Sequence, residues 1–208
     1  QTTAAYAVVD LKNQLLQGKM IPYRFEMTFN RSYADPICRD LHSADLVLED
    51  GSHMKLSGVF DRMDICQDEE HVYVKVLDYK SSGKEIDVTK VSVGLQLQLL
   101  IYTNVVLEVL QREFPNKKII PAGSLYYGFR VPMVEKTGKK LTEALQHKIQ
   151  RETAMTGVVN KEEPSISYLG DIETLPVKRK KTEEGTEIEE SDTVLTESNY
   201  RQLLEEVT

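Results

Sequence analysis

A long apolar stretch near the middle of the chain constrains the fold more than any other feature. Residues 91–114 are apolar on nearly every side when placed on a helix, and Pro115 ends the run. A helix of this kind is buried over most of its surface. Gln, Asn and Glu interrupt its most apolar part, residues 95–110, so it is not a membrane span. We therefore expect a core helix that packs against a sheet.

Strand-like segments lie on both sides of this helix. Residues 23–30 alternate between apolar and polar side chains, which predicts a half-buried strand with Tyr23, Phe25, Met27 and Phe29 on one face. Turn signals such as Asp50-Gly51 separate the next strands. We interpret the three strands before the helix as a β-meander. The further predicted strands are residues 45–49, 55–66, 72–78 and 119–134.

The ends of the chain carry weaker signals. Helical spacing predicts helices over residues 3–17, 142–153 and 198–207, with Ser198 as a candidate N-cap. Residues 177–188 are polar and segregated by charge. They predict an exposed hairpin or a mobile loop with a surface role, or a basic patch for nucleic acid. The order helix, strands, helix, strand predicts an α/β fold.

Composition limits the class of protein. The 208 residues can hold one large domain, or one domain with an appendage. Two cysteines, Cys38 and Cys66, exclude a disulfide framework and a four-cysteine metal site, so a reducing cytoplasm is the default expectation. The net charge of −7 argues against a stand-alone nucleic-acid binder. It does not exclude a nuclease, because carboxylates that hold a divalent metal make such a site acidic.

Asp78 and Lys80 are the first candidate site residues. They end the strand-like run of residues 72–77, and residues two apart on a strand share a face. Tyr79 then points to the opposite face. The ordinary interpretation is a solvated ion pair. The functional interpretation is that the carboxylate holds a metal ion and the ammonium orients a water molecule beside it.

Hairpin parity adds a second carboxylate to this face. With a loop around residues 67–70, Asp61 lies opposite Val76, on the same face as Asp78 and one diagonal step away. Two carboxylates at this separation can share a hard cation such as Mg²⁺. Asp64 falls on the other face, where it pairs with Arg62 or caps the strand end. An odd loop or a bulge would reverse the two, so Asp64 stays a reserve candidate.

Three further residues are candidates. Glu26 is either a solvent-facing strand residue or a third acid, and the second role needs its strand to lie beside the meander. Gln98 and Tyr102 are four apart on the central helix and share a face. Their polar groups need partners when buried. They either bond to backbone, or meet the end of the Asp78 strand, fix Lys80 or touch a phosphate.

Three motifs together resemble a known family. Gly58-x-x-Asp61, Asp78-Tyr-Lys80 and Gln98-x-x-x-Tyr102, in this order, resemble the RecB-like branch of the PD-(D/E)xK nucleases. The similarity is greatest to the C-terminal nuclease domain of the B subunit of AddAB-type helicase–nucleases. Glu26 with Phe29 resembles the acidic motif that precedes these three.

The resemblance implies a restriction-endonuclease-like core, which is a central mixed sheet flanked by helices. It implies Mg²⁺- or Mn²⁺-dependent hydrolysis of DNA and the processing of double-strand ends for recombinational repair, together with a helicase–nuclease A subunit and no membrane. By position, Asp61 and Asp78 would be metal ligands, Lys80 would position the attacking water, and Glu26, Gln98 and Tyr102 would complete the site. Residues 1–135 would be the nuclease core and residues 136–208 its extension.

The chain departs from the family pattern in its cysteines. The family's iron–sulfur cluster uses one cysteine before the nuclease core and three after it, and Cys38 and Cys66 are at neither place. A family helix with a metal-binding histidine would also precede Gln1. We therefore expect a piece of a longer protein that ends before the cysteine cluster and cannot form it. Whether that piece is active alone stays open.

Two other functions remain possible at this point. One is a catalytically silent nuclease-fold module for DNA contact or subunit assembly. The other is a stand-alone RecB-like or CRISPR-associated nuclease. The presence of Asp61, Asp78 and Lys80 together argues against a decayed site.

Overall fold

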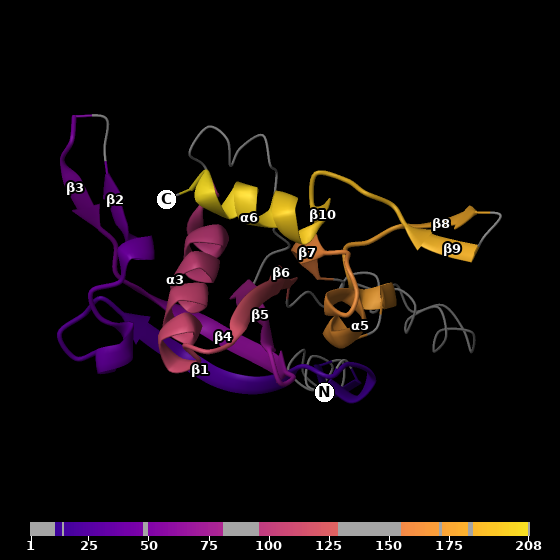
Figure 1. Cartoon of the computed structure of the whole chain (residues 1–208), viewed down its shortest axis with the longest axis horizontal. Coiled ribbons are helices and arrows are strands. Elements are labelled where there is room, and N and C mark those ends of the chain that lie inside the picture. The colour runs from indigo at the N-terminus through magenta and orange to yellow at the C-terminus, as the bar shows by residue number, and fades with distance from the viewer. Residues whose placement is uncertain are drawn as a thin grey trace, which may run out of the picture.

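A mixed sheet forms the centre of the molecule (Figure 1). The computed structural model describes residues 11–13, 15–47, 50–80, 96–128, 155–170, 172–182 and 185–207. Within these residues the sheet has six strands in the order β1-β4-β5-β6-β7-β10. The predicted α/β fold with a central mixed sheet is confirmed. Its strands are β1 (Ile21–Phe29), β4 (Gly58–Gln67), β5 (His71–Lys80), β6 (Lys118–Gly128), β7 (Thr156–Asn160) and β10 (Val194–Leu195).

The predicted central helix connects two parallel strands. β5 and β6 are parallel, whereas β4 is antiparallel to both β1 and β5. A parallel pair needs a crossover connection, and this one contains α3 (Gln98–Glu113). Residues 91–95 of the predicted helix lie outside the described part. The buried side chains of α3 are Leu99, Leu100, Ile101, Thr103, Val105, Val106, Val109 and Leu110.

Helices cover both faces of the sheet. On the first face α3 and α6 (Glu197–Glu205) pack over Val74 and Val76 of β5. On the second face α5 (Ser165–Leu169) packs over Tyr73 and Leu77. Residues 11–13 and 15–17 are helical, as predicted for this segment. In the part of the chain that the structure describes, no helix combines the length and the apolar composition needed to cross a membrane.

The predicted meander is wrong in its first strand. β2 (Asp45–Val47) and β3 (His53–Lys55) form a separate two-stranded ribbon instead of joining the central sheet. The predicted strand over residues 55–66 breaks because Leu56 turns inward, where its N–H donates to the carbonyl of Ala44. The free edge of β4 then pairs with β1, so the strand that carries Glu26 does lie beside β4.

The predicted alternation of β1 is also interrupted. Glu26 has a left-handed backbone with φ 49°, and the register of β1 shifts between Pro22 and Arg24. Phe25 is therefore 59% exposed, and its ring centroid lies 5.8 Å from the guanidinium carbon of Arg62. It does not share the buried face with Met27, as the alternation predicted.

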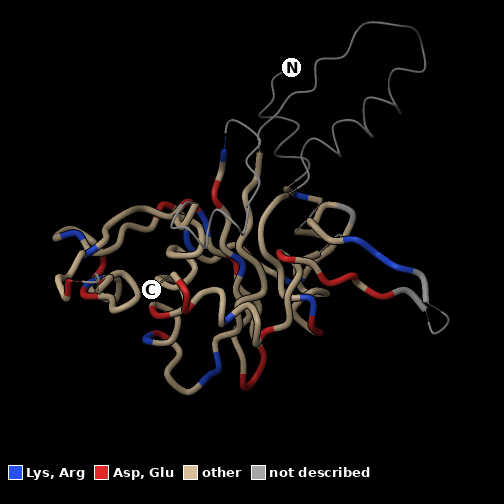
Figure 2. The backbone as a smooth tube through the Cα atoms, turned by 90° about the horizontal axis from the view of Figure 1, so that it is seen from above, with Lys and Arg blue, Asp and Glu red and all other residues tan. Residues whose placement is uncertain are grey.

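The C-terminal third contains the predicted charged hairpin. β8 (Arg179–Thr182) and β9 (Gly185–Ile188) pair antiparallel and project from the body, with basic residues along β8 and acidic ones along β9 (Figures 1 and 2). α6 begins at Glu197, so its N-cap is Thr196 and not Ser198. The predicted helix over residues 142–153 and the end of the strand over residues 119–134 lie outside the described residues.

The short helices are η1 (Pro36–Cys38), η2 (His42–Ala44) and η3 (Ile172–Thr174).

A buried charge cluster joins β4 and β5 on the second face. Asp64 is fully buried and accepts two hydrogen bonds from Arg62, at 2.6 Å from Nε and 2.8 Å from Nη2. The Nζ of Lys75, its partner in the strand register, lies 3.1 Å away. Burial lowers the pKa of Lys75, against the opposing effect of the Asp64 carboxylate. The predicted pairing of Asp64 with Arg62 is confirmed.

Replacing Asp64 should destabilise the fold strongly. Asp64→Asn leaves two buried cations without their counter-charge, which we expect to lower the free energy of unfolding by about 3–5 kcal/mol. Urea denaturation measures this loss. The control is Asp192→Asn in an exposed turn, for which we expect a change within about 0.5 kcal/mol. Equal losses in the two variants would contradict a structural role for the cluster.

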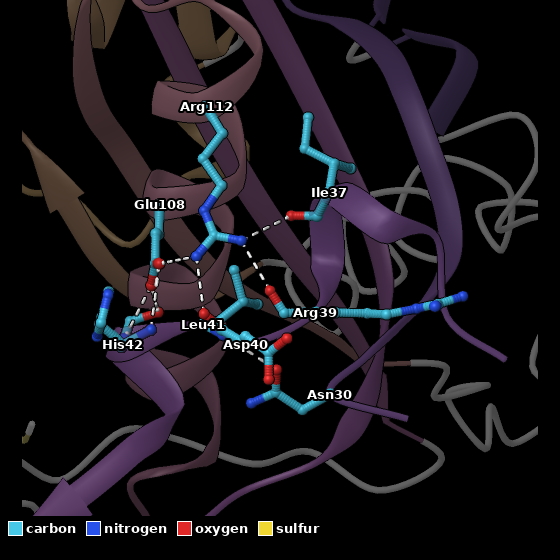
Figure 3. A network of polar contacts seen from close by, with 9 residues as sticks. Asn30, Ile37, Arg39, Asp40, Leu41, His42, Glu108 and Arg112 are labelled. Atoms are coloured by element: carbon cyan, nitrogen blue, oxygen red, sulfur yellow. Dashed lines mark hydrogen bonds and ion pairs between the residues drawn. The ribbon is translucent and has the colours of Figure 1, made fainter. Parts of the chain in front are cut away.

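Two side chains of α3 fasten residues 37–43 to the helix (Figure 3). Glu108 accepts from the N–H of His42 at 3.1 Å and from the N–H and hydroxyl of Ser43 at 2.8 and 2.7 Å. Arg112 donates to the carbonyls of Arg39 at 2.7 Å and Asp40 at 2.8 Å. Burial opposes ionisation of Glu108, but these hydrogen bonds and the charge of Arg112 outweigh it. The pKa of Glu108 therefore lies below its ordinary value.

This network predicts a pH-dependent stability difference. Because folding lowers the pKa of Glu108, its contribution is complete above the unfolded value of about 4.3 and is lost as pH falls through the folded pKa. At pH 7 we expect the free energy of unfolding of the Glu108→Gln variant to be about 1 kcal/mol lower than that of the original protein. The gap should close as pH falls below about 4.3 in urea titrations. A gap that stays constant as pH falls would contradict the assignment.

Candidate active site

The β4–β5 register brings Asp61 closer to Asp78 than predicted. Met63 pairs with Val76 and Arg62 with Leu77, and one further step places Asp61 directly across from Asp78. The prediction had Asp61 opposite Val76, because it placed the centre of the turn one residue too early, which moves each partner on β5 by two residues. A shift of two residues keeps every side chain on its face, since the side-chain period of a strand is two. The predicted face was therefore right and the predicted partner wrong.

The Asp61 carboxylate takes the place of a backbone acceptor. Backbone pairing of β4 with β5 ends at Arg62 and Leu77, although both strands continue. Beyond that point Oδ2 of Asp61 accepts from the N–H of Tyr79 at 2.7 Å. This bond fixes the first carboxylate against the residue between Asp78 and Lys80.

Asp78 and Lys80 form an ion pair at the end of β5. Oδ2 of Asp78 contacts Nζ of Lys80. Asp78 is only 3% exposed, whereas Lys80 is partly exposed. The pair is therefore not the solvated surface pair of the ordinary interpretation. A buried carboxylate carries a desolvation cost that a cation or hydrogen bonds must offset.

Tyr126 is a site residue that the sequence did not reveal. It is next to Asp78 in the parallel β5–β6 register and is 1% exposed. Nζ of Lys80 lies 5.5 Å from the centroid of its ring. Burial, then the charges of Asp78 and Tyr102, raise the pKa of Tyr126 to about 12. Its hydroxyl is therefore neutral near pH 7. The sequence signal was absent because the pairing of β5 with β6 crosses a long connection.

Gln98 and Tyr102 lie at the start of α3, above the same face. Nε2 of Gln98 donates to the hydroxyl of Tyr102 at 3.0 Å, so the two meet each other. The Tyr102 ring packs edge-on against Phe29, with centroids 5.8 Å apart. A Cβ at Gly58 would lie 3.0 Å from the Phe29 ring and 3.3 Å from the Tyr102 hydroxyl. Glycine at this position therefore permits the close contact of β4 with the helix.

Glu26 is across from Asp61 but is not joined to it. It lies between the register pairs Phe25–Arg62 and Met27–Phe60. The side chain is exposed, and among the described residues it forms no hydrogen bond or ion pair. Its left-handed backbone changes the direction that the strand alternation predicted. The structure thus groups Asp61, Asp78 and Lys80, with Glu26 at the margin and Asp64 on the opposite face.

The donor set suits a hard divalent cation. The described residues contain no group of three or more His, Cys, Asp or Glu side chains that could hold a metal ion. They do bring together two carboxylates, Asp61 and Asp78, one of them buried. Mg²⁺ is commonly held by one or two protein carboxylates, with waters and substrate phosphate oxygens completing its six ligands. These residues therefore fit Mg²⁺ or Mn²⁺ on the chemistry of their oxygens.

The cysteines do not fit an iron–sulfur cluster. Such a cluster is normally held by four thiolates. Cys38 is fully buried in the core of the first face, and burial raises its pKa to about 11. Cys66 packs against the core of the second face. The two cysteines of this sequence are therefore separated by the sheet.

Comparison with known proteins identifies the family. The model of the PD-(D/E)XK nuclease superfamily matches residues 2–206. The B subunit of the ATP-dependent helicase/deoxyribonuclease of Clostridioides difficile (strain 630) is 34% identical over 156 residues, which are 75% of this chain and 13% of that protein. The protein of the same name from Alkaliphilus oremlandii (strain OhILAs) is 31% identical over 206 residues, 97% of this chain and 17% of that protein.

The chain thus spans about a sixth or less of the length of these relatives. The family match nevertheless extends over nearly all of its residues and includes every element of the central sheet. The chain belongs to the PD-(D/E)XK nuclease superfamily.

Proposed function

We propose that this chain is a metal-dependent deoxyribonuclease domain that hydrolyses phosphodiester bonds. The observation that carries the proposal is the juxtaposition of three groups at the end of β5. Asp61 and Asp78 face each other across two paired strands, and Lys80 is ion-paired with Asp78. Two carboxylates can hold a metal ion that assists attack on a phosphate, and an ammonium beside them can offset developing negative charge.

Asp61 and Asp78 would hold Mg²⁺ or Mn²⁺. Such an ion supplies charge for the leaving oxygen and acidifies a bound water. The bond from the Tyr79 N–H occupies Oδ2 of Asp61, so the carboxylate orientation is set before any ligand arrives. Preorganised groups of this kind lower the reorganisation needed during the reaction.

Lys80 would act on the water and on the developing charge. Its ammonium lies between the Asp78 carboxylate and the neutral ring of Tyr126. An ammonium in this position can hold the attacking water by a hydrogen bond and offset negative charge on the phosphate oxygens. The Tyr126 ring limits where Nζ can move. Gln98 and Tyr102, bonded to each other at the start of α3, would close the site from that side.

The larger assignment follows the relatives' names. We propose that the chain is part of a helicase–nuclease in the cytoplasm, that it acts on DNA with a helicase A subunit, and that it processes double-strand ends for recombinational repair. The match to B subunits of helicase/deoxyribonucleases supports the partner and the substrate. An iron–sulfur cluster, where such a protein contains one, would take its thiolates from outside this sequence.

Loss of Asp78 should weaken metal binding and abolish cutting. Asp78→Asn keeps the shape of the side chain but removes the charge that holds the cation. Loss of an outer-shell partner typically weakens a metal 10–100-fold. For this ligand we therefore expect Mn²⁺ affinity to fall by at least about tenfold, measured by isothermal titration calorimetry. DNA cleavage should become undetectable in the chain and in the longer protein proposed to contain it.

The matched control for this variant is Glu69→Gln, which removes an exposed acid from the β4–β5 turn. It should bind Mn²⁺ and cut DNA normally. Normal cutting by Asp78→Asn would refute the nuclease assignment of the site. Normal Mn²⁺ binding by the original protein without any cutting, even in the longer protein, would favour the silent nuclease-fold module.

Lys80 can be tested separately from the metal. Lys80→Met keeps the length of the side chain but removes the ammonium, so Asp78 loses a competing cation. Mn²⁺ affinity should stay equal or rise, while the single-turnover cleavage rate falls by about 10²–10⁴-fold. Calorimetry and a quenched-flow cleavage assay measure the two effects. Parallel loss of affinity and rate would instead mean that Lys80 only supports the fold of the site.

A further inference from the structure

A polar pocket lies next to the start of β4, the strand that carries Asp61. It has a volume of about 380 Å³ and lies between residues 30–42 and residues 55–57. Small-ligand pockets commonly measure roughly 300–1,000 Å³. Three residues with cationic side chains line this pocket, and the family motifs include none of them. They are Arg31, Arg39 and Lys55.

The charge of this pocket is opposite to that of the chain. Its three cations face two lining carboxylates, Asp40 and Asp45, which leaves an excess of one positive charge. The Nδ1 of His53 lies 3.2 Å from the carboxylate of Asp45, within hydrogen-bond distance. The chain as a whole has a net charge of −7. A local cationic concavity on such a chain suits an anionic ligand.

The arginines keep donors for a ligand. Arg31 donates from Nη1 to the hydroxyl of Tyr33, and Arg39 donates from Nε to the carbonyl of Ala34, both at 2.7 Å. A guanidinium has five N–H donors, so each of these bonds orients the group and uses only one. Both groups and Lys55 are exposed. Guanidinium groups match phosphate oxygens in geometry as well as charge.

The pocket walls are fixed before a ligand binds. The side chain of Asn30 joins them, because its Nδ2 donates to the carbonyl of Leu56 at 3.0 Å and its Oδ1 accepts from the N–H of Leu41 at 3.1 Å. Arg112 holds the backbone at Arg39 from α3 (Figure 3). Such a preformed site avoids much of the ordering cost of binding.

Two residues that line the pocket are chain neighbours of residues next to the candidate active site. Asn30 follows Phe29 and Ser57 precedes Gly58, and both of these neighbours contact Tyr102 at the start of α3. From Ser57 the strand runs four residues to Asp61, about 13 Å at 3.3 Å per residue. A strand of nucleic acid held in the pocket would therefore reach the carboxylates within a few nucleotides.

We propose that this pocket binds backbone phosphate of the single DNA strand that enters the active site. The proposal rests on the proposed nuclease function and assigns Arg31, Arg39 and Lys55 to phosphate contact. It places the strand along α3, from the pocket past Tyr102 to Asp61. Base identity has no part in this contact, because phosphates position a strand without specifying its sequence.

The basic strand β8 fits this ligand less well. Lys180 is directly opposite Glu187 in the hairpin register, and Glu189 and Glu190 follow the end of β9. Its cations therefore have acids beside them. The exposed pair Lys178 and Arg179 provides a charge-matched control for the pocket.

The test compares two double variants that lose the same charge. Arg31→Gln with Lys55→Gln alters the pocket, and Lys178→Gln with Arg179→Gln alters β8. Binding of fluorescent single-stranded DNA is measured by anisotropy in EDTA over a series of salt concentrations. For the pocket variant we expect Kd to rise on the order of tenfold and the slope of log K against log salt to fall by about 1.4. In the control variant, Kd should change by no more than about twofold, and the slope of log K against log salt should stay the same.

Two further measurements separate the possible causes. A methylphosphonate oligonucleotide, whose backbone is uncharged, should bind the original protein and the pocket variant equally. Unfolding midpoints in urea should be the same for both double variants. Equal loss of DNA affinity in the control would show that net charge alone matters and would overturn the pocket. Unchanged affinity in the pocket variant would overturn it as well.

This assay is independent of the cleavage test. Because it runs without metal, the pocket can fail while Asp78→Asn still weakens Mn²⁺ binding and abolishes cutting, and the nuclease function then stands. Conversely, normal cutting by Asp78→Asn with weakened DNA binding by the pocket variant would refute the active site and leave a phosphate-binding surface.

Discussion

The hydrogen bond from the Tyr79 N–H to the Asp61 carboxylate is the contact on which the site depends. It lies where the backbone ladder of β4 and β5 ends and the strands begin to separate. The Asp61 carboxylate thus links the two strands beyond their last backbone pair and also faces Asp78. Because the bond uses only one of its oxygens, the other can still bind a cation.

The two faces of the β4–β5 pair carry different groups, a buried ion cluster on the second face and the carboxylates of the site on the first. Arg62, next to Asp61, points to the second face and binds both Asp64 and the hydroxyl of Tyr79. Tyr79 in turn lies between Asp78 and Lys80. The buried cluster therefore stabilises the register of the two strands on the second face. The alternate residues place the two carboxylates on the first face. A fault in the cluster would be expected to disturb the position of the site as well as stability.

The sequence predicted the faces of the site better than its contacts. The buried helix α3 and the shared face of Asp61 and Asp78 follow from local periodicity, and both predictions were confirmed. The partner of Asp61 depended on the exact position of the turn, which periodicity does not fix. The left-handed backbone of Glu26 and the neighbour Tyr126 depend on tertiary packing and on a parallel pairing across a long connection. The pocket around Asn30 needed the breaking of the strand at Leu56, which the alternation of side chains did not indicate.

The central claim is that Asp61 and Asp78 hold one divalent cation together. A crystal of the protein grown with Mn²⁺ and measured near the manganese absorption edge tests it most directly. We expect an anomalous peak within coordination distance of an oxygen of each carboxylate, on the face covered by α3. A peak held by Asp64 or by neither carboxylate, or no peak at saturating Mn²⁺, would contradict the account.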